Sequence, residues 1–202
     1  MVEMHLLAVN VDFSYNPIFA LGVVTSFDRF MQGYQPESDR ESIFNALLRA
    51  IEADPQIYRQ DAQRLQELAK SLPPQDLIAA LSLQTQLNRD ADLQSHLQAI
   101  ASNPKFKYSR LFAIGLFSLL ELSDPELVKD EKRRTEALKS IATGLHISDD
   151  KLNKDLELYR SNLDKMAQAL VVMADMLSAD RKKREQRSQQ SSTTVTPPTT
   201  SE

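Results

Sequence analysis

Side chains that could do chemistry are few in this chain and lie far apart. The histidines are His5, His96 and His146, and no Glu-x-x-His or His-x-x-x-His pair puts a second metal ligand beside any of them on a helix. The chain has no cysteine, which excludes thiolate nucleophiles, disulfides and zinc–thiolate sites. It also has no phosphate-binding glycine loop and no Gly-x-Ser-x-Gly elbow. The residues therefore predict a protein without a catalytic centre, a metal site or a cofactor.

Charged residues interrupt two stretches that are otherwise apolar. Asp28 and Arg29 lie within residues 17–31, and Arg110 lies at the edge of residues 105–122. A carboxylate beside a guanidinium can act in catalysis, but such pairs far more often join packed helices. We therefore expect these charges to form partly buried structural ion pairs.

The second of these stretches, KFKYSRLFAIGLFSLLEL, is the element around which we expect the chain to fold. From Leu111 onward it is apolar on every side of a helical wheel except at Ser118 and Glu121. A helix without a polar side lies at the centre of a soluble protein, and this one is shorter than the ~20 apolar residues that a membrane span needs. Asn103-Pro104 should begin the helix, since Asn caps helices and Pro suits the first turn.

The first stretch is similar to the second. Each has an Asn-Pro dipeptide before an aromatic-Ala-aliphatic-Gly core, which gives Gly22 and Gly115 equivalent positions. A glycine within a helix lets another backbone approach closely. We hypothesise that the two helices cross near Gly22 and Gly115. The alternative is a chance likeness between two apolar helices.

Start and stop signals divide most of the remaining chain into amphipathic helices. Residues 1–11 carry an apolar face, and residues 75–101 predict one or two helices with a break near 88–92. The apolar residues of the opening segment are Met4, Leu6, Leu7 and Val11. The start signals are a capping box at Ser38 and Glu41, Asp54-Pro55 and Asp124-Pro125, and the stop signals are Gly33 and Gly144.

Composition agrees with a helical fold. Hydrophobic residues make up 42% and charged residues 26% of the chain, as in ordinary soluble domains, and only four glycines occur in 202 residues. The net charge of −4 argues against a general nucleic-acid binder. We predict an all-α, multi-helix bundle around a central apolar helix, with a long C-terminal helix of coiled-coil type.

That last helix, which begins near Ser148, has the most regular pattern. Its apolar residues are spaced alternately by four and three, the a/d repeat of a coiled-coil seam. The seam consists of Leu152, Leu156, Tyr159, Leu163, Met166, Leu170, Met173 and Leu177. The pattern leaves open whether its partner is the body of the protein, a second copy or another protein. The residues predicted to bind an external partner are Leu163, Met166, Leu170, Met173 and Leu177.

Five basic residues follow the seam: Arg181, Lys182, Lys183, Arg184 and Arg187. Cations near a helix C-terminus complement the helix dipole, which accounts for them without a further function. The alternative is contact with an anionic membrane surface, where each basic residue contributes about 1 kcal/mol. From 188 on the chain is rich in Gln, Ser, Thr and Pro and is predicted to be disordered. The predicted parts are a helical body (1–147), a long helix (148–187) and a disordered tail (188–202).

Four of these stretches together resemble the thylakoid formation family, also called photosystem II biogenesis factors, of cyanobacteria and chloroplasts. They are NPIFALGVVTSFDRFMQGYQ, SIFNALLRAIEADPQIYRQDAQRL, KYSRLFAIGLFSLLEL and DLELYRSNLDKMAQAL, and the likeness extends in the same order over residues 1–185. The residues that match the family's motifs, without an assigned role, include Gly22, Asp28, Gly33, Tyr34, Tyr58, Tyr108, Arg110, Gly115 and Tyr159.

The resemblance implies an all-helical, non-enzymatic protein without a cofactor, peripheral to the cytoplasmic or stromal side of the thylakoid membrane. It implies a role in thylakoid biogenesis and in photosystem II assembly and repair, where the protein supports an FtsH-type membrane protease. An alternative is an assembly chaperone that binds photosystem II or antenna subunits directly. Family members usually carry a segment before the residues seen here, so we expect an N-terminally shortened form.

Overall fold

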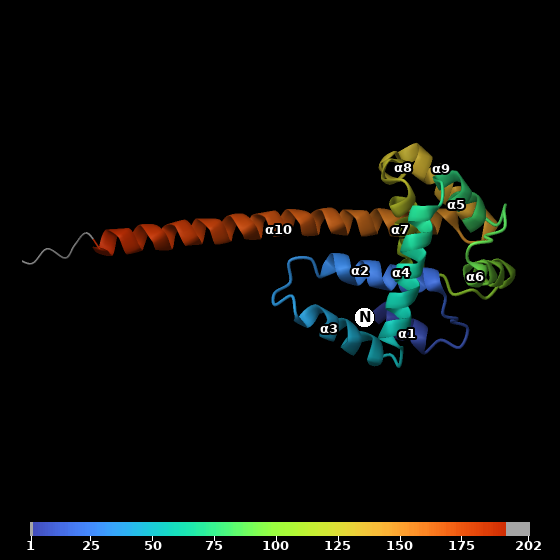
Figure 1. Ribbon diagram of the computed structural model, residues 1–202, viewed down its shortest axis with the longest axis horizontal. Helices are drawn as coiled ribbons and strands as arrows, with labels where there is room; N and C mark the ends of the chain where they lie inside the picture. The colour runs from blue at the N-terminus through green and yellow to red at the C-terminus, as the bar shows by residue number, and fades with distance from the viewer. Residues whose placement is uncertain (1, 193–202) are drawn as a thin grey trace, which may run out of the picture. The chain divides into compact units, whose positions relative to one another are not determined.

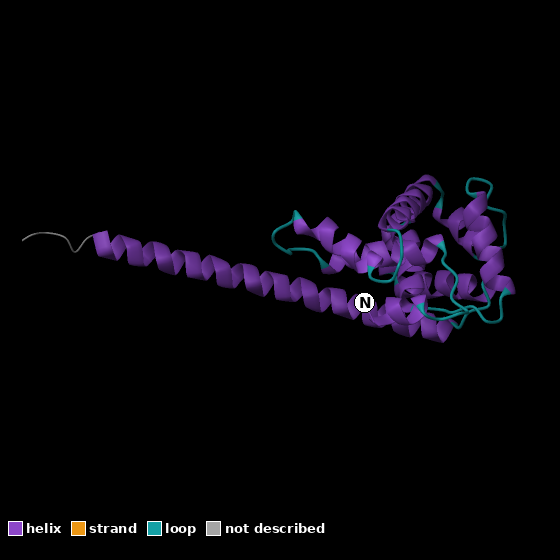
Figure 2. Cartoon of the chain, turned by 90° about the horizontal axis from the view of Figure 1, so that it is seen from below, coloured by secondary structure: helices purple, strands orange, loops and turns teal. Residues whose placement is uncertain are grey.

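The computed structural model describes residues 2–192 of the chain, with side chains described for residues 2–186. All regular secondary structure in these residues is helical, which confirms the predicted all-α fold (Figure 2). The helices, labelled in Figure 1, are α1 (Val2–Ala8), α2 (Pro17–Phe30), α3 (Asp39–Arg49), α4 (Pro55–Ser71), α5 (Pro74–Leu81), α6 (Ala91–Ser102), α7 (Arg110–Ser123), α8 (Pro125–Lys129), α9 (Glu131–Gly144) and α10 (Asp149–Ser192). The chain forms two compact units, Met1–Ser161 and Asn162–Glu202, and the boundary between them lies within α10.

Helix α7 lies in the core of the first unit, as its all-round apolar sequence predicts. It buries every residue from Phe112 to Leu120. The polar member of this run, Ser118, donates its hydroxyl to the carbonyl of Ile114 at 2.7 Å, so the hydroxyl is paired. Helices α2 and α4 both pack against α7. These three helices therefore make the centre of the unit.

The crossing of α2 and α7 depends on two glycines. A β-carbon added to Gly22 would lie 1.7 Å from the carbonyl oxygen of Leu111 in α7. One added to Gly115 would lie 1.9 Å from the carbonyl oxygen of Ile18 in α2. No side chain fits at such distances, so the two helix backbones are in direct contact. The hypothesis of a glycine crossing is confirmed.

Helix α7 begins at Arg110, and the predicted start at Asn103-Pro104 is wrong. The hydroxyl of Ser109 caps the helix by accepting the N–H of Phe112 at 3.0 Å. The loop before the helix packs the ring of Tyr108 edge-on against Phe112, with the ring centres 6.5 Å apart. Ser109 itself has extended φ and ψ angles of −133° and 159°, so the helix starts only after it.

Helix α1 buries less than its apolar pattern predicts. Of the expected face Met4 is buried, whereas Leu6 is 61% exposed. Val11 lies beyond the helix and is 97% exposed. The helix ends at Ala8, and the side chain of Asn10 then accepts the N–H of Asp12 in a turn. Of the predicted apolar face of residues 1–11, only Met4 is therefore buried, and Leu7 is partly covered.

The capping box predicted at Ser38 and Glu41 is also wrong. Ser38 makes no side-chain cap in α3. Glu41 instead pairs with Arg59 of α4 at 3.1 Å. A tertiary ion pair thus takes the carboxylate that the box requires.

Most other predicted helix boundaries are confirmed. Asp54 and Asp124 cap α4 and α8 through their side chains, and α9 ends at Gly144. Residues 75–101 divide into α5 and α6, with Asp90 as the cap of α6. The sequence analysis missed the cap at Asp130, which separates α8 from α9.

Several helix ends use a left-handed residue that is not glycine. Glu52 after α3, Leu83 after α5 and His146 after α9 have φ angles of 59°, 58° and 55°. Gly33, with a φ of 78°, follows α2 as the stop signal predicts. Gly144 serves a contact instead, because a β-carbon there would lie 2.1 Å from the carbonyl oxygen of Ser82.

Candidate functional site

One ion-pair group joins α2, α7 and the beginning of α10. Arg29 pairs with Glu121 of α7, and its guanidinium carbon lies 5.9 Å from the centre of the Tyr159 ring. Tyr159 is 2% exposed, and burial raises the pKa of its hydroxyl. The rings of Phe30 and Phe117 pack edge-on against it. The group fixes the place where the three helices meet.

A second group contains Asp28. Both of its carboxylate oxygens accept hydrogen bonds from Arg59 of α4 at 2.9 Å, and Glu41 of α3 binds the same guanidinium at 3.1 Å. The guanidinium carbon of Arg59 also lies 4.0 Å from the centre of the Phe44 ring, a cation–π contact. The charges are engaged in holding helices together, which confirms the expectation of structural ion pairs for Asp28 and Arg29.

Arg110 takes part in a third group, with Asp155 of α10. The two side chains lie 3.4 Å apart, and Asp155 also accepts a hydrogen bond from the hydroxyl of Tyr108 at 3.0 Å. Burial, together with the Asp155 charge, raises the pKa of Tyr108. The backbone N–H of Arg110 is bound by Glu3 at 2.7 Å. The group therefore links α1, α7 and the beginning of α10.

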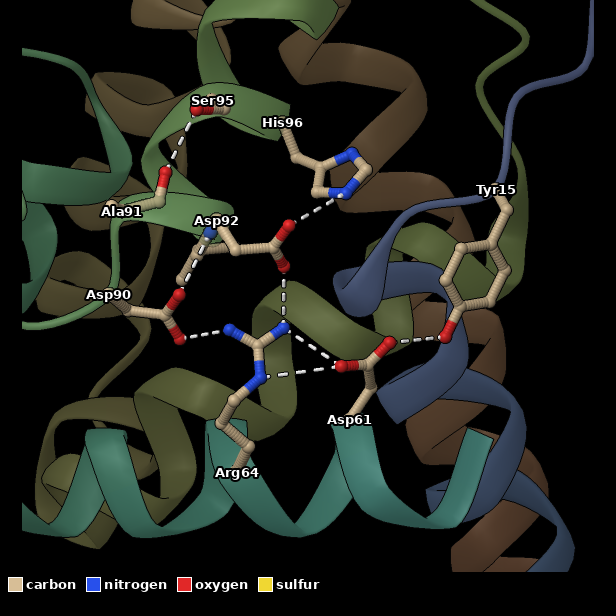
Figure 3. Close-up of polar contacts among 9 residues, drawn as sticks. Tyr15, Asp61, Arg64, Asp90, Ala91, Asp92, Ser95 and His96 are labelled. Carbon is tan, nitrogen blue, oxygen red and sulfur yellow. Dashed lines mark hydrogen bonds and ion pairs between the residues drawn. The ribbon is translucent and has the colours of Figure 1, made fainter. Parts of the chain in front are cut away.

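The largest polar cluster was not anticipated from the sequence. It consists of Tyr15, Asp61, Arg64, Asp90, Asp92 and His96 (Figure 3). The guanidinium of Arg64 lies among three carboxylates, one on its own helix and two at the start of α6. Tyr15 donates its hydroxyl to Asp61 at 2.5 Å, and burial raises the pKa of that hydroxyl. Its members come from distant stretches of the chain, so no local motif could reveal it.

The charged groups of the described residues do not assemble into a metal site. Within residues 2–192 no group of three or more His, Asp or Glu side chains has the geometry to hold a metal ion. Over the same residues, no helix combines the length and the apolar character needed to cross a membrane.

The exposure of the α10 seam residues differs between the two units. In the first unit Leu152, Leu156 and Tyr159 are 0%, 2% and 2% exposed. In the second unit Leu163, Met166 and Leu170 are only partly covered. Farther along, Met173 is 58% and Leu177 is 70% exposed. The residues predicted to bind a partner thus lie on the described surface, and their role stays a prediction.

Sequence analysis overlooked part of this surface. Met176 is 66% exposed and lies beside the seam, one turn from Met173. It belongs to the run LVVMADML, which is apolar on more than the two a/d positions. Together with the exposed seam residues it forms what we call the α10 stripe: Leu163, Met166, Leu170, Met173, Met176 and Leu177.

The basic residues after the stripe are exposed where their side chains are described. Arg181 pairs with Glu185 one turn away at 3.2 Å, and Lys182, Lys183 and Arg184 face solvent. The side chain of Arg187 lies outside the described residues. Helix α10 continues to Ser192, beyond the predicted end at 187. Residues 193–202 of the predicted disordered tail lie outside the described residues.

Most of the remaining motif residues are buried or make contacts that hold the fold together. Tyr58 is 5% exposed, its ring centre lies 5.2 Å from that of Tyr15, and burial raises its pKa to about 12. Gly22 and Gly115 form the helix crossing and Gly33 the turn after α2. Of the four tyrosines among the motif residues, only Tyr34 is exposed, at 41%.

Comparison with known proteins agrees with this picture. Residues 1–188 match the thylakoid formation protein family. Protein Thf1 of Nostoc punctiforme is 79% identical over 202 residues, which cover 100% of this chain and 86% of that protein. Protein Thf1 of Trichormus variabilis is 76% identical over 198 residues, 98% of this chain and 85% of that protein.

A solved structure is also similar. The structure of Psb29 has a TM-score of 0.75 and 41% sequence identity, and the match covers 91% of this chain and 84% of that one. The family match extends over nearly the whole chain, and sequence and structure comparisons agree on it. The chain therefore belongs to the thylakoid formation protein family, and it has a role in thylakoid and photosystem II biogenesis.

Proposed function

We propose that this protein is a non-enzymatic helical adaptor that supports the accumulation or activity of a membrane FtsH protease during photosystem II assembly and repair. The observation that carries the proposal is the α10 stripe, where large apolar side chains remain exposed along one helix. Exposed apolar patches of this kind mark surfaces for protein or membrane partners. The stripe would bind the protease or a protein associated with it.

The charges around the stripe favour a protein partner there. Between 163 and 180 the charged residues are Asp164, Lys165, Asp175 and Asp180, so this part of the helix is net negative. A helix that lies along an anionic membrane normally has a basic polar face. A protein groove that accepts one face of an amphipathic helix makes no such demand.

The basic end supports a separate contact with the membrane. Lys182, Lys183 and Arg184 are exposed close together, whereas Arg181 is paired with Glu185. Each basic residue near an anionic lipid surface contributes about 1 kcal/mol. We propose that this end attaches the protein peripherally to the cytoplasmic or stromal side of the thylakoid membrane.

The exposed methionines favour a second candidate, an assembly chaperone. Met173 and Met176 are 58% and 66% exposed. Methionine side chains are flexible and adapt to more than one partner surface. On this alternative the stripe binds unassembled photosystem II or antenna subunits directly, and effects on the protease are secondary.

A pull-down from gently solubilised cyanobacterial thylakoids tests the adaptor. The tagged protein is compared with a Met173→Glu/Leu177→Glu variant and with a control, Gln168→Glu/Ser178→Glu, which adds the same charge on the other side of the helix. We expect the protein and the control to recover the protease and the stripe variant to lose at least tenfold. Equal recovery by all three would reject the stripe as the contact.

The same experiment in cells that lack the protease separates the two candidates. Recovery of photosystem subunits that depends on Met173 and Leu177 in these cells would favour the chaperone. For the membrane contact, flotation with vesicles of phosphatidylglycerol or of neutral galactolipid compares the protein with Lys182→Glu/Lys183→Glu. Binding that ignores both the lipid charge and these substitutions would reject the lipid contact.

A further inference from the structure

The methionines of α10 are concentrated on the stripe. Within the described part of the second unit, all three methionines, Met166, Met173 and Met176, are stripe residues. Along the uncovered part of the seam, methionine alternates with leucine, whereas the three covered seam residues of the first unit are leucine and tyrosine. Methionine therefore occurs in the seam only where the seam is uncovered.

Two of these methionines are open to solvent. Met173 is 58% and Met176 is 66% exposed, and residues three positions apart are neighbours on one face of a helix. The other described methionines are less accessible: Met4 is 8% exposed, and Met31 and Met166 are partly covered. Solvent and small solutes thus reach the sulfur atoms of Met173 and Met176 more freely than those of the other three.

The thioether is also the side chain of this protein that an oxidant attacks most readily. The chain has no cysteine and no tryptophan to compete for the oxidant. A peroxide converts the methionine side chain to the sulfoxide, and reductases specific for the two sulfoxide epimers reverse the change. A reversible modification is therefore chemically available at these two positions.

The reaction needs only the thioether and one molecule of hydrogen peroxide. The sulfur lone pair attacks one peroxide oxygen, so that an S–O bond forms while the O–O bond breaks. The proton on the transferred oxygen passes to the departing hydroxide, which leaves as water. The sulfur loses two electrons, and the peroxide gains them.

Oxidation at these positions would change the character of the stripe. Met173 lies in the seam between Leu170 and Leu177, and Met176 lies beside it. A sulfoxide is polar, and burying a polar group without a hydrogen-bond partner costs free energy. A partner that covers the stripe with apolar side chains would therefore bind the oxidised form more weakly.

The fold of the protein should tolerate the change. Both side chains are more than half exposed and belong to the second unit, so oxidation there adds no polar group to the core of the first. Core residues such as Leu156, which is 2% exposed, keep their contacts. The modification would thus alter a surface without unfolding the protein.

We propose that Met173 and Met176 are a reversible oxidation site, at which peroxide converts the thioethers to sulfoxides and makes the α10 stripe polar. The consequence for partner binding rests on the function proposed for the stripe. The site itself rests on the exposure of the two side chains and the chemistry of their sulfur atoms.

Peptide mass spectrometry of the full chain treated with limiting hydrogen peroxide tests the site. We expect Met173 and Met176 to gain oxygen at least tenfold faster than Met4. In concentrated urea all three should react at similar rates, because burial no longer protects Met4. Equal rates in the folded protein would overturn the proposal.

Hydrophobic-interaction chromatography tests the effect on the stripe without a partner. Peroxide should make the protein elute earlier, and Met173→Gln/Met176→Gln should do so without peroxide. Met173→Leu/Met176→Leu should be unaffected by peroxide, since leucine keeps the apolar volume and lacks sulfur. Met4→Leu/Met31→Leu removes two methionines elsewhere and should still respond. Unchanged retention of the treated protein would overturn the proposal.

The protease pull-down tests the consequence for binding. Treated protein should recover at least fivefold less protease, treated Met173→Leu/Met176→Leu should recover as much as before, and sulfoxide reductases should restore the loss. Equal recovery by treated and untreated protein would reject control of binding by oxidation. Failure of the untreated protein to recover any protease would reject the proposed function alone, because the mass spectrometry and the chromatography decide the oxidation site without a partner.

Discussion

The two halves of α10 follow the same a/d repeat, but their apolar side chains are buried in the first unit and exposed in the second. In the first unit the α10 seam is covered, and Leu156 is 2% exposed. In the second unit the repeat continues without interruption, and Leu177 is 70% exposed. The repeat thus specifies an apolar face but not what covers it. A buried seam contributes to folding, and an exposed seam is available for binding.

The contacts at the end of the buried half explain the difference. Tyr159 is enclosed by Phe30, Phe117 and Arg29 from two other helices. The described residues after Ser161 belong to a separate compact unit, in which α10 is the described element. Its apolar side chains therefore have no second helix of that unit to pack against.

Truncating the buried half should give the largest effect. Leu156→Ala removes a side chain that is fully enclosed and leaves a cavity, so we expect a loss of about 2–5 kcal/mol in the free energy of unfolding. Urea unfolding followed by circular dichroism measures it. A loss below ~1 kcal/mol would show that the inner seam is not part of the core.

A methyl group at the helix crossing should have the next largest effect. Gly115→Ala raises intrinsic helix propensity by about 1 kcal/mol, but its β-carbon would meet the carbonyl oxygen of Ile18 at 1.9 Å. The helices must separate, and we expect a net loss of about 1–3 kcal/mol. Ala174→Val, on the exposed half of α10, is the control and should change stability little. A more stable Gly115→Ala protein would contradict the backbone contact.

Alkaline pH should act on the buried tyrosines of the first unit, because all five tyrosines precede residue 161. An unfolded tyrosine loses its proton near pH 10, whereas burial raises the pKa of folded Tyr58 to about 12. The folded state then holds the proton that the unfolded state releases, so stability should fall as pH rises from 10 to 12. Tyr58→Phe should make the fall shallower in denaturant titrations at each pH. An identical slope would mean that Tyr58 is not buried.

Truncating the exposed half should give the smallest effect. Leu177→Ala removes a side chain that is already 70% exposed, so the free energy of unfolding should change by no more than about 0.5 kcal/mol. The same variant should reduce recovery of the partner, which Leu156→Ala should affect only through folding. If Leu177→Ala destabilises the protein as much as Leu156→Ala, the two halves of the seam are equivalent.

Sequence reasoning predicted what depends on neighbouring residues. The all-α fold, the caps at Asp54 and Asp124 and the glycine crossing follow from local pattern, because glycine and the capping residues have strong local preferences. The predicted start of α7 was wrong because Ser109, and not Asn103, provides the cap of the helix.

The ion pairs between helices also could not be predicted from neighbouring residues. Arg64 binds Asp90 and Asp92, which lie 26 and 28 positions away, and Glu41 leaves its expected cap for Arg59. Such pairings are decided by the packing of whole helices.

The left-handed residues at helix ends indicate a substitution that would stabilise the protein. Glu52 is exposed and holds a φ of 59°, a conformation that costs a residue with a side chain about 1 kcal/mol more than glycine. Three of the four glycines of this chain, Gly22, Gly115 and Gly144, lie against the backbone of another segment, and only Gly33 has a positive φ. A glycine at position 52 would therefore raise the thermal tolerance of a laboratory form of the protein while the α10 stripe keeps its native residues.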